Sequence, residues 1–402
     1  DMCNGTIMDK LISFSIPLML SGILQLMFNA VDIVVVGRFS GSQALAAVGS
    51  TAALINVFTN LFIGISLGAN VLAARYYATG KTKEMSETVH TAIALALVSG
   101  VAMAVIGVVF ARGALEIMGT PDDVIAKSTL YMRIYFCGMP FFMMYNYGAA
   151  ILRAVGDTKR PLIFLIVSGV INAVLNLFLV IGFHLDVAGV GIATVISQLV
   201  SCILVLRCLH HTESSYQLHL AKLRIRSVYL KQIFEVGVPA GIQSTVINIS
   251  NAMLQSSVNS FGSIAMAGYT ASNNIFGFLY VSVNSFTQAC MSFTSQNYGV
   301  KKLKRMDRVL IDCMILSVVV TLILGSSVYI FGPELLHIYS NQADVIKYGM
   351  EIFSYTTVTY FLCGLMDLFP GALRGMGYST VPMILSIIGT VGVRIIWIYG
   401  LF

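Results

Sequence analysis

Leu-Arg-Ala-Val-Gly-Asp-Thr-Lys-Arg-Pro at residues 152–161 recurs, with changes, as Leu-Arg-Gly-Met-Gly-Tyr-Ser-Thr-Val-Pro at residues 373–382. Both copies keep the Leu-Arg pair, the glycine four residues after the leucine (Gly156, Gly377) and the closing proline, at an offset of 221 residues. Because glycine often ends a helix and proline often starts the next, each copy predicts a tight turn between two helices. The repeat therefore predicts two copies of one helical arrangement.

The repeat extends beyond these turns. Gly41-Ser42 recurs as Gly262-Ser263 at the same offset, and Pro17 matches Pro239 at an offset of 222. A duplicated bundle of apolar helices is the usual plan of a membrane transporter, in which one half moves against the other around a site between them. We therefore expect this class of protein.

The composition favours a membrane protein. Hydrophobic residues make up 57% of the 402 residues and charged residues only 10%, and the mean hydropathy is +0.84. A soluble domain carries about 25% charged residues. The seven cysteines show no paired spacing, so we interpret them as small buried hydrophobic residues.

Runs of about 20 apolar residues predict eleven membrane-spanning helices. We expect these helices at residues 11–36, 46–74, 88–110, 128–150, 161–182, 188–208, 231–257, 267–294, 308–331, 345–370 and 380–402.

The spans divide the chain into three parts. Residues 1–206 form an N-terminal lobe of six helices, residues 207–230 a polar cytosolic linker, and residues 231–402 a C-terminal lobe of five. The helix at 188–208 has no counterpart in the second copy, so we expect a twelfth helix in the natural protein. The predicted fold is all-α, with two pseudo-symmetric six-helix lobes.

The distribution of Lys and Arg predicts the orientation. If the N-terminus lies inside, inner loops hold eighteen of these residues and outer loops four. Cytoplasmic loops carry the excess of positive charge, so we expect a multi-pass protein of the bacterial inner membrane with its N-terminus in the cytoplasm. The net charge of +6 is then a topology signal, and no soluble basic domain that would bind nucleic acid is predicted.

Four polar side chains are expected at one depth in the first half. Asp32, Asn172, Asn176 and Thr194 lie about 17–22 Å from the inner ends of their helices at a rise of 1.5 Å per residue. Oxygen ligands of this kind suit a small cation such as Na⁺, and a carboxylate removed from water favours its protonated form. Alternatively, the Asn and Thr side chains only join helices by hydrogen bonds.

The second half lacks this polar set. Val393 and Trp397 stand at the positions of Asn172 and Asn176. It has instead two other deep charges, Asp367 near the inner end of one helix and Arg394 midway along the next. These two side chains could pair with each other, or Arg394 could bind a backbone carbonyl, so they have either a structural role or a part in a second-lobe cavity.

The chain resembles the multidrug and toxic compound extrusion (MATE) transporters. The resemblance covers the whole chain and rests on Val-Asp-Ile-Val-Val-Val-Gly at 31–37, on Ala-Leu-Ala-Ala-Val-Gly at 44–49 and on the paired turns above. It implies twelve helices in two six-helix lobes around a V-shaped cavity. It also implies proton- or sodium-driven antiport of organic, often cationic, drugs or toxins.

The resemblance also implies roles for single residues. In the prokaryotic branch, the ion-coupling cluster matches Asp32, Asn172 and Thr194. The second acidic residue of that cluster corresponds to Asn176 here, which removes one negative charge. This difference favours proton coupling through Asp32 over tight sodium binding.

Two other functions remain open. A lipid-linked oligosaccharide flippase of the same superfamily would need a cationic cavity, for which only Arg394 and Arg133 supply deep positive charge. An integral membrane enzyme would need a catalytic constellation, but the chain has no ATP-binding P-loop, and His210, His211 and His219 of the linker lack a metal-ligand partner at a suitable spacing. We therefore expect a monomeric, lipid-embedded transporter of drug-like compounds that is not an enzyme, with H⁺ or Na⁺ as coupling ion and no other cofactor or metal.

Overall fold

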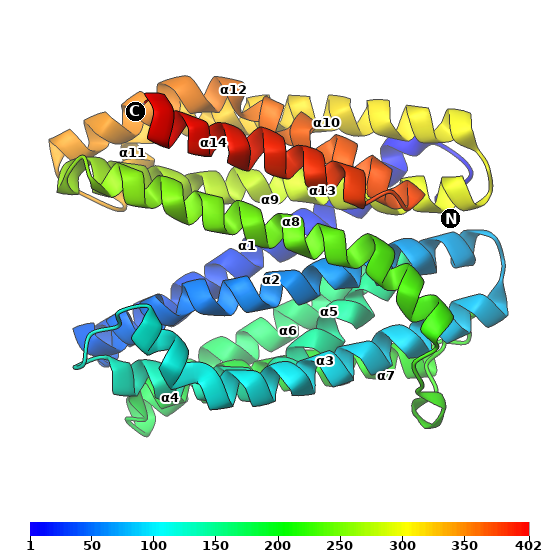
Figure 1. Cartoon of the computed structure of the whole chain (residues 1–402), viewed down its shortest axis with the longest axis horizontal. Coiled ribbons are helices and arrows are strands. Elements are labelled where there is room, and N and C mark those ends of the chain that lie inside the picture. The colour runs from blue at the N-terminus through cyan, green and yellow to red at the C-terminus, as the bar shows by residue number, and fades with distance from the viewer. Residues whose placement is uncertain (402) are drawn as a thin grey trace. The chain divides into compact units, whose positions relative to one another are not determined.

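A computed structural model describes residues 1–401, and every regular element within this range is a helix (Figure 1). The first half contains α1 (Ile7–Phe39), α2 (Ser42–Ala78), α3 (Thr82–Ile117), α4 (Ile125–Cys137), α5 (Met139–Ala154), α6 (Lys159–Asn176) with the π-helical turn η1 (Leu177–Gly182), and α7 (Asp186–His211). The second half contains η2 (Leu220–Lys222), α8 (Ser227–Asn259), α9 (Ser263–Gly299), α10 (Leu303–Ile330), α11 (Gly332–His337), α12 (Ala343–Met376), α13 (Thr380–Ser386), η3 (Ile387–Gly392), α14 (Val393–Ile396) and η4 (Trp397–Leu401).

The helices confirm the expected all-α membrane fold. Eight helical segments are long and apolar enough to cross a membrane: α1, α2, α3, α6 with η1, α7, α10, α12, and the segment Thr380–Gly400. The expected spans 231–257 and 267–294 lie in α8 and α9, which have 33 and 37 residues but are rich in Ser, Asn and Gln. The last expected span, 380–402, includes residue 402, which lies outside the described residues.

The prediction of one continuous helix at 128–150 is wrong, because the chain forms two helices there, α4 and α5, which are separated at Gly138. Pro140 follows the break and has no backbone N–H to continue the hydrogen-bond ladder. A Cβ atom on Gly138 would lie 2.5 Å from the side-chain Oε1 of Gln198 on α7. The break therefore gives α7 room to place a polar side chain against the start of α5.

The repeated turns have the same backbone geometry in both halves. Gly156 and Gly377 have φ angles of 95° and 100°, a left-handed conformation that glycine adopts without a steric penalty. Each glycine N–H bonds to the arginine carbonyl three residues earlier, and the next N–H bonds to the carbonyl of the leucine, Leu152 or Leu373. This pair of bonds is a Schellman motif, so the Leu-Arg-x-x-Gly pattern is a helix-ending signal in both halves.

The chain forms two compact units whose boundaries differ from the expected lobes. The N-terminal unit comprises residues 20–241, and the C-terminal unit comprises residues 1–19 and 242–402. The start of α1 therefore belongs to the C-terminal unit and the start of α8 to the N-terminal unit. The segment between α7 and α8 that is outside α-helix is also shorter than the expected linker 207–230, because α7 continues to His211 and α8 begins at Ser227.

Glycines allow helices of the N-terminal unit to cross at backbone contact. A Cβ atom on Gly64 of α2 would lie 2.2 Å from the Cα of Gly241 on α8, and one on Gly237 would lie 2.5 Å from the Cα of Ile65. Small residues four apart on both helices permit this approach, as in other membrane helix pairs. In the C-terminal unit, α12 packs against α9 and α10, and the Phe14 ring of α1 meets Phe293 of α9 edge-on at 5.6 Å.

Candidate functional site

A close contact between α1 and α6 sets the geometry of the candidate site. A Cβ atom on Gly169 of α6 would lie 1.9 Å from the ring of Phe28 on α1, so only glycine accommodates the ring. Asp32 lies four residues after Phe28, and Asn172 and Asn176 lie three and seven residues after Gly169. Residues at these spacings share a helix face, so the contact brings the faces that carry these polar side chains together.

Asp32, Asn176 and Asn172 form one hydrogen-bonded chain. The side-chain Nδ2 of Asn176 donates to Oδ1 of Asp32 and also donates, over 3.1 Å, to Oδ1 of Asn172. Asn176 is fully buried, Asn172 is 6% exposed, and Asp32 is half-buried. The carboxylate is therefore held by a neutral amide inside an apolar helix pair.

Two groups of this hydrogen-bonded set lack a partner that such groups usually have. Within residues 1–401, no Lys or Arg forms an ion pair with Asp32, so its negative charge has no opposite charge in direct contact. The Oδ1 of Asn176 is buried and has no hydrogen-bond partner in the described part of the chain. Buried polar atoms are nearly always hydrogen-bonded, so a carboxylate without a counter-charge beside an amide oxygen without a hydrogen-bond partner indicates a functional site.

The backbone changes form directly after this chain. Asn176 is the last residue of α6, and the helix continues as the π-helical turn η1 from Leu177 to Gly182. π-Helical turns within α-helices occur frequently at functional sites. The irregular turn therefore adjoins the residue that contacts Asp32.

Thr194 does not join the hydrogen-bonded chain in this structure. Its hydroxyl donates to the carbonyl of Val190, 2.9 Å away on its own helix. The side chain is half-buried, and its oxygen retains capacity as an acceptor or ligand. Its role in ion coupling stays a prediction.

Aromatic and amide side chains near Asp32 were missed by sequence reasoning. Tyr131 and Tyr135 of α4 lie within electrostatic range of the Asp32 carboxylate. Gln198 of α7 is near Tyr135 and has a buried Oε1 without a partner among the described residues. The i, i+4 spacing of the two tyrosines on one face of α4 was the available signal, but tyrosines are too numerous in this chain for that spacing to stand out.

The C-terminal unit places its two deep charges apart, so both suggested partners of Arg394 are wrong. The Nη1 of Arg394 donates to Oδ1 of Asn251 at 2.6 Å and to the Ser250 hydroxyl at 3.2 Å, both on α8. It forms no ion pair with Asp367 among residues 1–401. The reason is that hydroxyl and amide oxygens of α8 already satisfy the Arg394 guanidinium.

Asp367 belongs to a separate polar cluster. Its carboxylate lies near the hydroxyl of Tyr280 on α9 and near the positive charge of Arg374. Arg374, the arginine of the second Leu-Arg turn, donates to the buried side chain of Gln243 on α8. The positive charge of Arg374 thus partly compensates the negative charge of Asp367, whereas Asp32 forms no such pair within residues 1–401.

The fold and this site define a class of protein. The membrane fold is all-helical and duplicated, and one half holds a deep, uncompensated acid that has no equivalent in the other half. This is the arrangement of a membrane transporter. Comparison with known proteins identifies the family. The MatE family model matches residues 17–178 and, separately, residues 239–399, and the chain belongs to this family.

Known relatives and structures resemble the chain over almost its whole length. It is 29% identical to "Probable multidrug resistance protein YoeA" of Bacillus subtilis over 95% of this chain and 84% of that protein. It is 22% identical to "Multidrug export protein MepA" of Staphylococcus aureus strain MW2, over 96% and 85% respectively. A solved multidrug resistance MATE family transporter of the MOP superfamily in an outward-facing conformation has the same fold, with a TM-score of 0.92 at 20% identity over 99% of this chain and 90% of that chain.

Membership in the MatE family confirms three expectations. The chain is a multi-pass membrane transporter, it is not an enzyme, and its two halves are copies of one unit. The matched ranges begin at Pro17 and Pro239, which are equivalent in the internal repeat.

Proposed function

We propose that this MatE-family transporter exports drug-like, cationic organic compounds in exchange for protons by alternating access of its two halves. Its relatives in Bacillus and Staphylococcus are described as multidrug resistance or multidrug export proteins, which supports the substrate class. The observation that carries the coupling part is the Asp32 carboxylate, which the Asn176 amide binds and which forms no ion pair within residues 1–401.

The side chains around Asp32 favour a proton over a sodium ion as the coupling ion. Na⁺ is bound by oxygen ligands, and Asp32, Asn172, Asn176 and Thr194 could supply four. Asn176, however, turns its Nδ2 toward the carboxylate and its Oδ1 away. A cation beside Asp32 would require this carboxamide to rotate, whereas a proton can bind the carboxylate directly.

The coupling step follows from the loss of the negative charge. A hydrogen bond to a charged acceptor is about twice as strong as one between neutral groups, so protonation of Asp32 weakens its contact with Asn176. The packing of α1 against α6 then changes. A proton bound from outside and a drug bound from inside can therefore favour opposite conformations, which is the requirement for antiport.

The proposed location is the cytoplasmic membrane of a bacterium. The segment that joins α7 to α8 and the turns with the excess of Lys and Arg would face the cytoplasm together with the N-terminus. Cysteine-accessibility labelling of intact cells, with one cysteine introduced at Thr212 and another at Asp123, tests this orientation. Labelling only at position 123 by a membrane-impermeant reagent supports it, and labelling only at position 212 contradicts it.

Dye efflux from proteoliposomes tests the coupling. With an imposed pH gradient, we expect the wild type to export a cationic dye, and Asp32→Asn to leak dye only at the rate of protein-free vesicles. Asp123→Asn, which removes an exposed carboxylate, is the matched control and should retain the wild-type rate. An imposed sodium gradient at equal pH should drive little efflux. Wild-type efflux by Asp32→Asn, or efflux driven by sodium alone, would overturn the proton-coupled proposal.

A further inference from the structure

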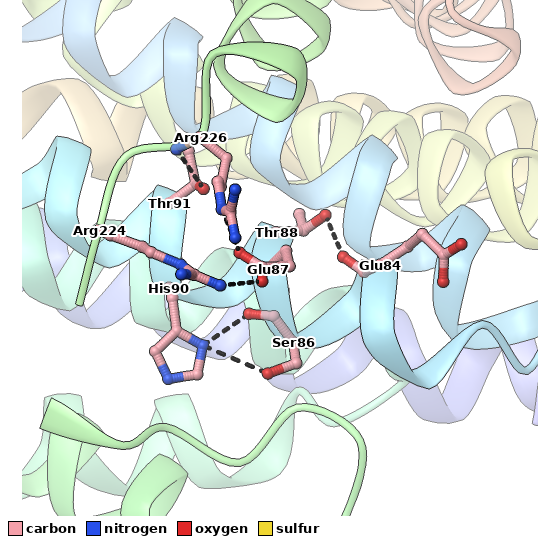
Figure 2. A network of polar contacts seen from close by, with 8 residues as sticks. All are labelled: Glu84, Ser86, Glu87, Thr88, His90, Thr91, Arg224 and Arg226. Carbon is pink, nitrogen blue, oxygen red and sulfur yellow. Dashed lines mark hydrogen bonds and ion pairs between the residues drawn. The ribbon is translucent and has the colours of Figure 1, made fainter. Parts of the chain in front are cut away.

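The segment between α7 and α8 is fixed on α3 at two places. We call residues 212–226 the linker segment. At its end, Glu87 of α3 forms ion pairs with Arg224 at 2.5 Å and Arg226 at 3.3 Å (Figure 2). The backbone N–H of Arg226 also donates to the Thr91 hydroxyl at 3.3 Å. These contacts attach the last residues before α8 to the side of α3.

The second attachment uses both ring nitrogens of His90, which is 3% exposed. The Nδ1 lies 2.6 Å from the carbonyl oxygen of Ser86 (Figure 2). The Nε2 accepts the backbone N–H of His219 in the linker segment at 3.0 Å. A carbonyl only accepts and an amide N–H only donates, so Nδ1 carries a hydrogen and Nε2 does not. The docked segment therefore requires the neutral form of His90, in one tautomer.

Protonation of His90 is incompatible with this geometry. A hydrogen on Nε2 would face the N–H of His219 across 3.0 Å, and two donors would be buried without an acceptor between them. The rings of His90 and His219 are also stacked, 6.2 Å apart with an angle of 14° between their planes. A charge on one imidazole would thus be placed beside the other.

The surroundings of the two imidazoles are mostly basic. The His210 ring of α7 meets His219 at 6.4 Å, and its Nδ1 lies 2.9 Å from the Leu218 carbonyl. The pKa of His219 is lowered by partial burial and then by the charges of Lys222, His90 and His210. The charged and titratable groups around His90 come from α3, α7 and the linker segment: Glu87, His210, His219, Lys222, Arg224 and Arg226.

We propose that the linker segment is a proton-sensitive latch. Neutral His90 holds the middle of the segment through the His219 N–H, and protonation of His90 releases it, while Glu87 keeps Arg224 and Arg226 attached. The released part is residues 212–222, whereas the start of α8 stays attached, because Arg226 remains bound to Glu87 and accepts the first N–H bond of that helix, from Leu230. An acidic environment on this side of the membrane would thereby free the middle of the linker segment without loosening the start of α8.

Amide hydrogen exchange of the full-length protein in lipid nanodiscs tests the latch without measuring transport. After correction for the intrinsic pH dependence of exchange, we expect peptides covering residues 212–222 to exchange about 10-fold faster at pH 5.5 than at pH 7.5, and peptides of the α3 interior to be unchanged. Unchanged exchange of residues 212–222 at pH 5.5 would overturn the proposal.

Two variants separate His90 from its neighbours. His90→Gln keeps an acceptor near the Nε2 position but cannot take up a proton, so most of the pH effect should disappear and only the part that protonation of His219 contributes should remain. His211→Gln is the matched control, because the hydrogen bond that His211 forms within residues 1–401 stays in its own helix, at 3.0 Å to the Arg207 carbonyl. The pH effect on residues 212–222 should remain in this variant. A pH effect of undiminished size in His90→Gln contradicts the latch.

One measurement on the wild type tests the latch even if the His90→Gln variant misfolds. Deuterium exchange at the imidazole C2 position reports the protonation of each histidine by mass spectrometry. The midpoint for His90 should coincide with the midpoint for release of residues 212–222. Separate midpoints would overturn the proposal even if His90→Gln cannot be purified. Since neither readout requires a substrate, failure of the latch is distinguishable from failure of the proposed drug export.

Discussion

Asn176 donates one amide hydrogen to Asp32 and the other to Asn172, so a single side chain connects α1 to two positions on α6. This arrangement leaves one carboxylate where the resemblance to MATE transporters implies two. The number of negative charges at the site should therefore determine which ion it binds.

Asn176→Asp tests this reasoning. A second carboxylate beside Asp32 would repel it, and a bound cation would relieve the repulsion. We expect sodium to stimulate dye efflux by Asn176→Asp about 10-fold or more over its rate without sodium, because like charges a few ångströms apart interact by more than ~1.4 kcal/mol at low effective dielectric constant. Efflux should be measured against sodium concentration at fixed pH. Asn176→Val, which removes the amide without adding charge, should stay insensitive to sodium, and sodium insensitivity of both variants would contradict the prediction.

Gly169→Ala should uncouple the transporter while the protein still folds. The added methyl group would overlap the Phe28 ring, push α1 away from α6 and so lengthen the contact between Asp32 and Asn176. We expect proton-driven efflux to fall by more than ~10-fold, as for a misplacement of about 1 Å at a functional site. The double variant Gly169→Ala with Phe28→Leu should recover much of the rate. No recovery would show that Gly169 serves another purpose.

Local signals made much of the fold predictable. The Leu-Arg-x-x-Gly turns end helices through bonds within six consecutive residues, so Gly156 and Gly377 could be placed from sequence alone. Depth along a helix depends only on the rise per residue, which is why Asp32, Asn172 and Asn176 were expected at one level. The structure brings these three together.

Rotation and tertiary packing could not be predicted in this way. Thr194 bonds to its own helix and not to the Asp32 set, and Arg394 turns toward Asn251 instead of Asp367. The direction of a side chain around the helix axis depends on which neighbours the helix packs against. The close approach of Gln198 to Gly138, sixty residues earlier in the chain, likewise depends on tertiary packing.

Gly64→Ala and Gly241→Ala should each destabilise the N-terminal unit. At both positions the new methyl group would meet the backbone of the other helix, 2.2 Å and 2.4 Å from the nearest atom. Overpacking of this kind costs about 1–3 kcal/mol, and we expect a fall in the unfolding temperature of several degrees in detergent. Gly49→Ala, also on α2 but with no atom within 4 Å of the added carbon, is the control and should leave the unfolding temperature unchanged or higher. Equal effects at Gly64 and Gly49 would refute the close crossing of α2 and α8.

The attachment of the linker segment should depend on pH through His219. Docking lowers the pKa of His219 below its ordinary value of 6.5, through partial burial first and the charge of Lys222 next. The undocked segment then binds a proton more tightly than the docked one, so docking is fully favoured above pH 6.5 and weakens as the pH falls below that value. Deuterium exchange at the imidazole C2 position should give a His219 pKa below 6.5. Lys222→Gln should raise that pKa, because it removes a positive charge, whereas Lys159→Gln on α6 should leave it unchanged. A His219 pKa that does not rise in Lys222→Gln would show that Lys222 does not act on the docked imidazole.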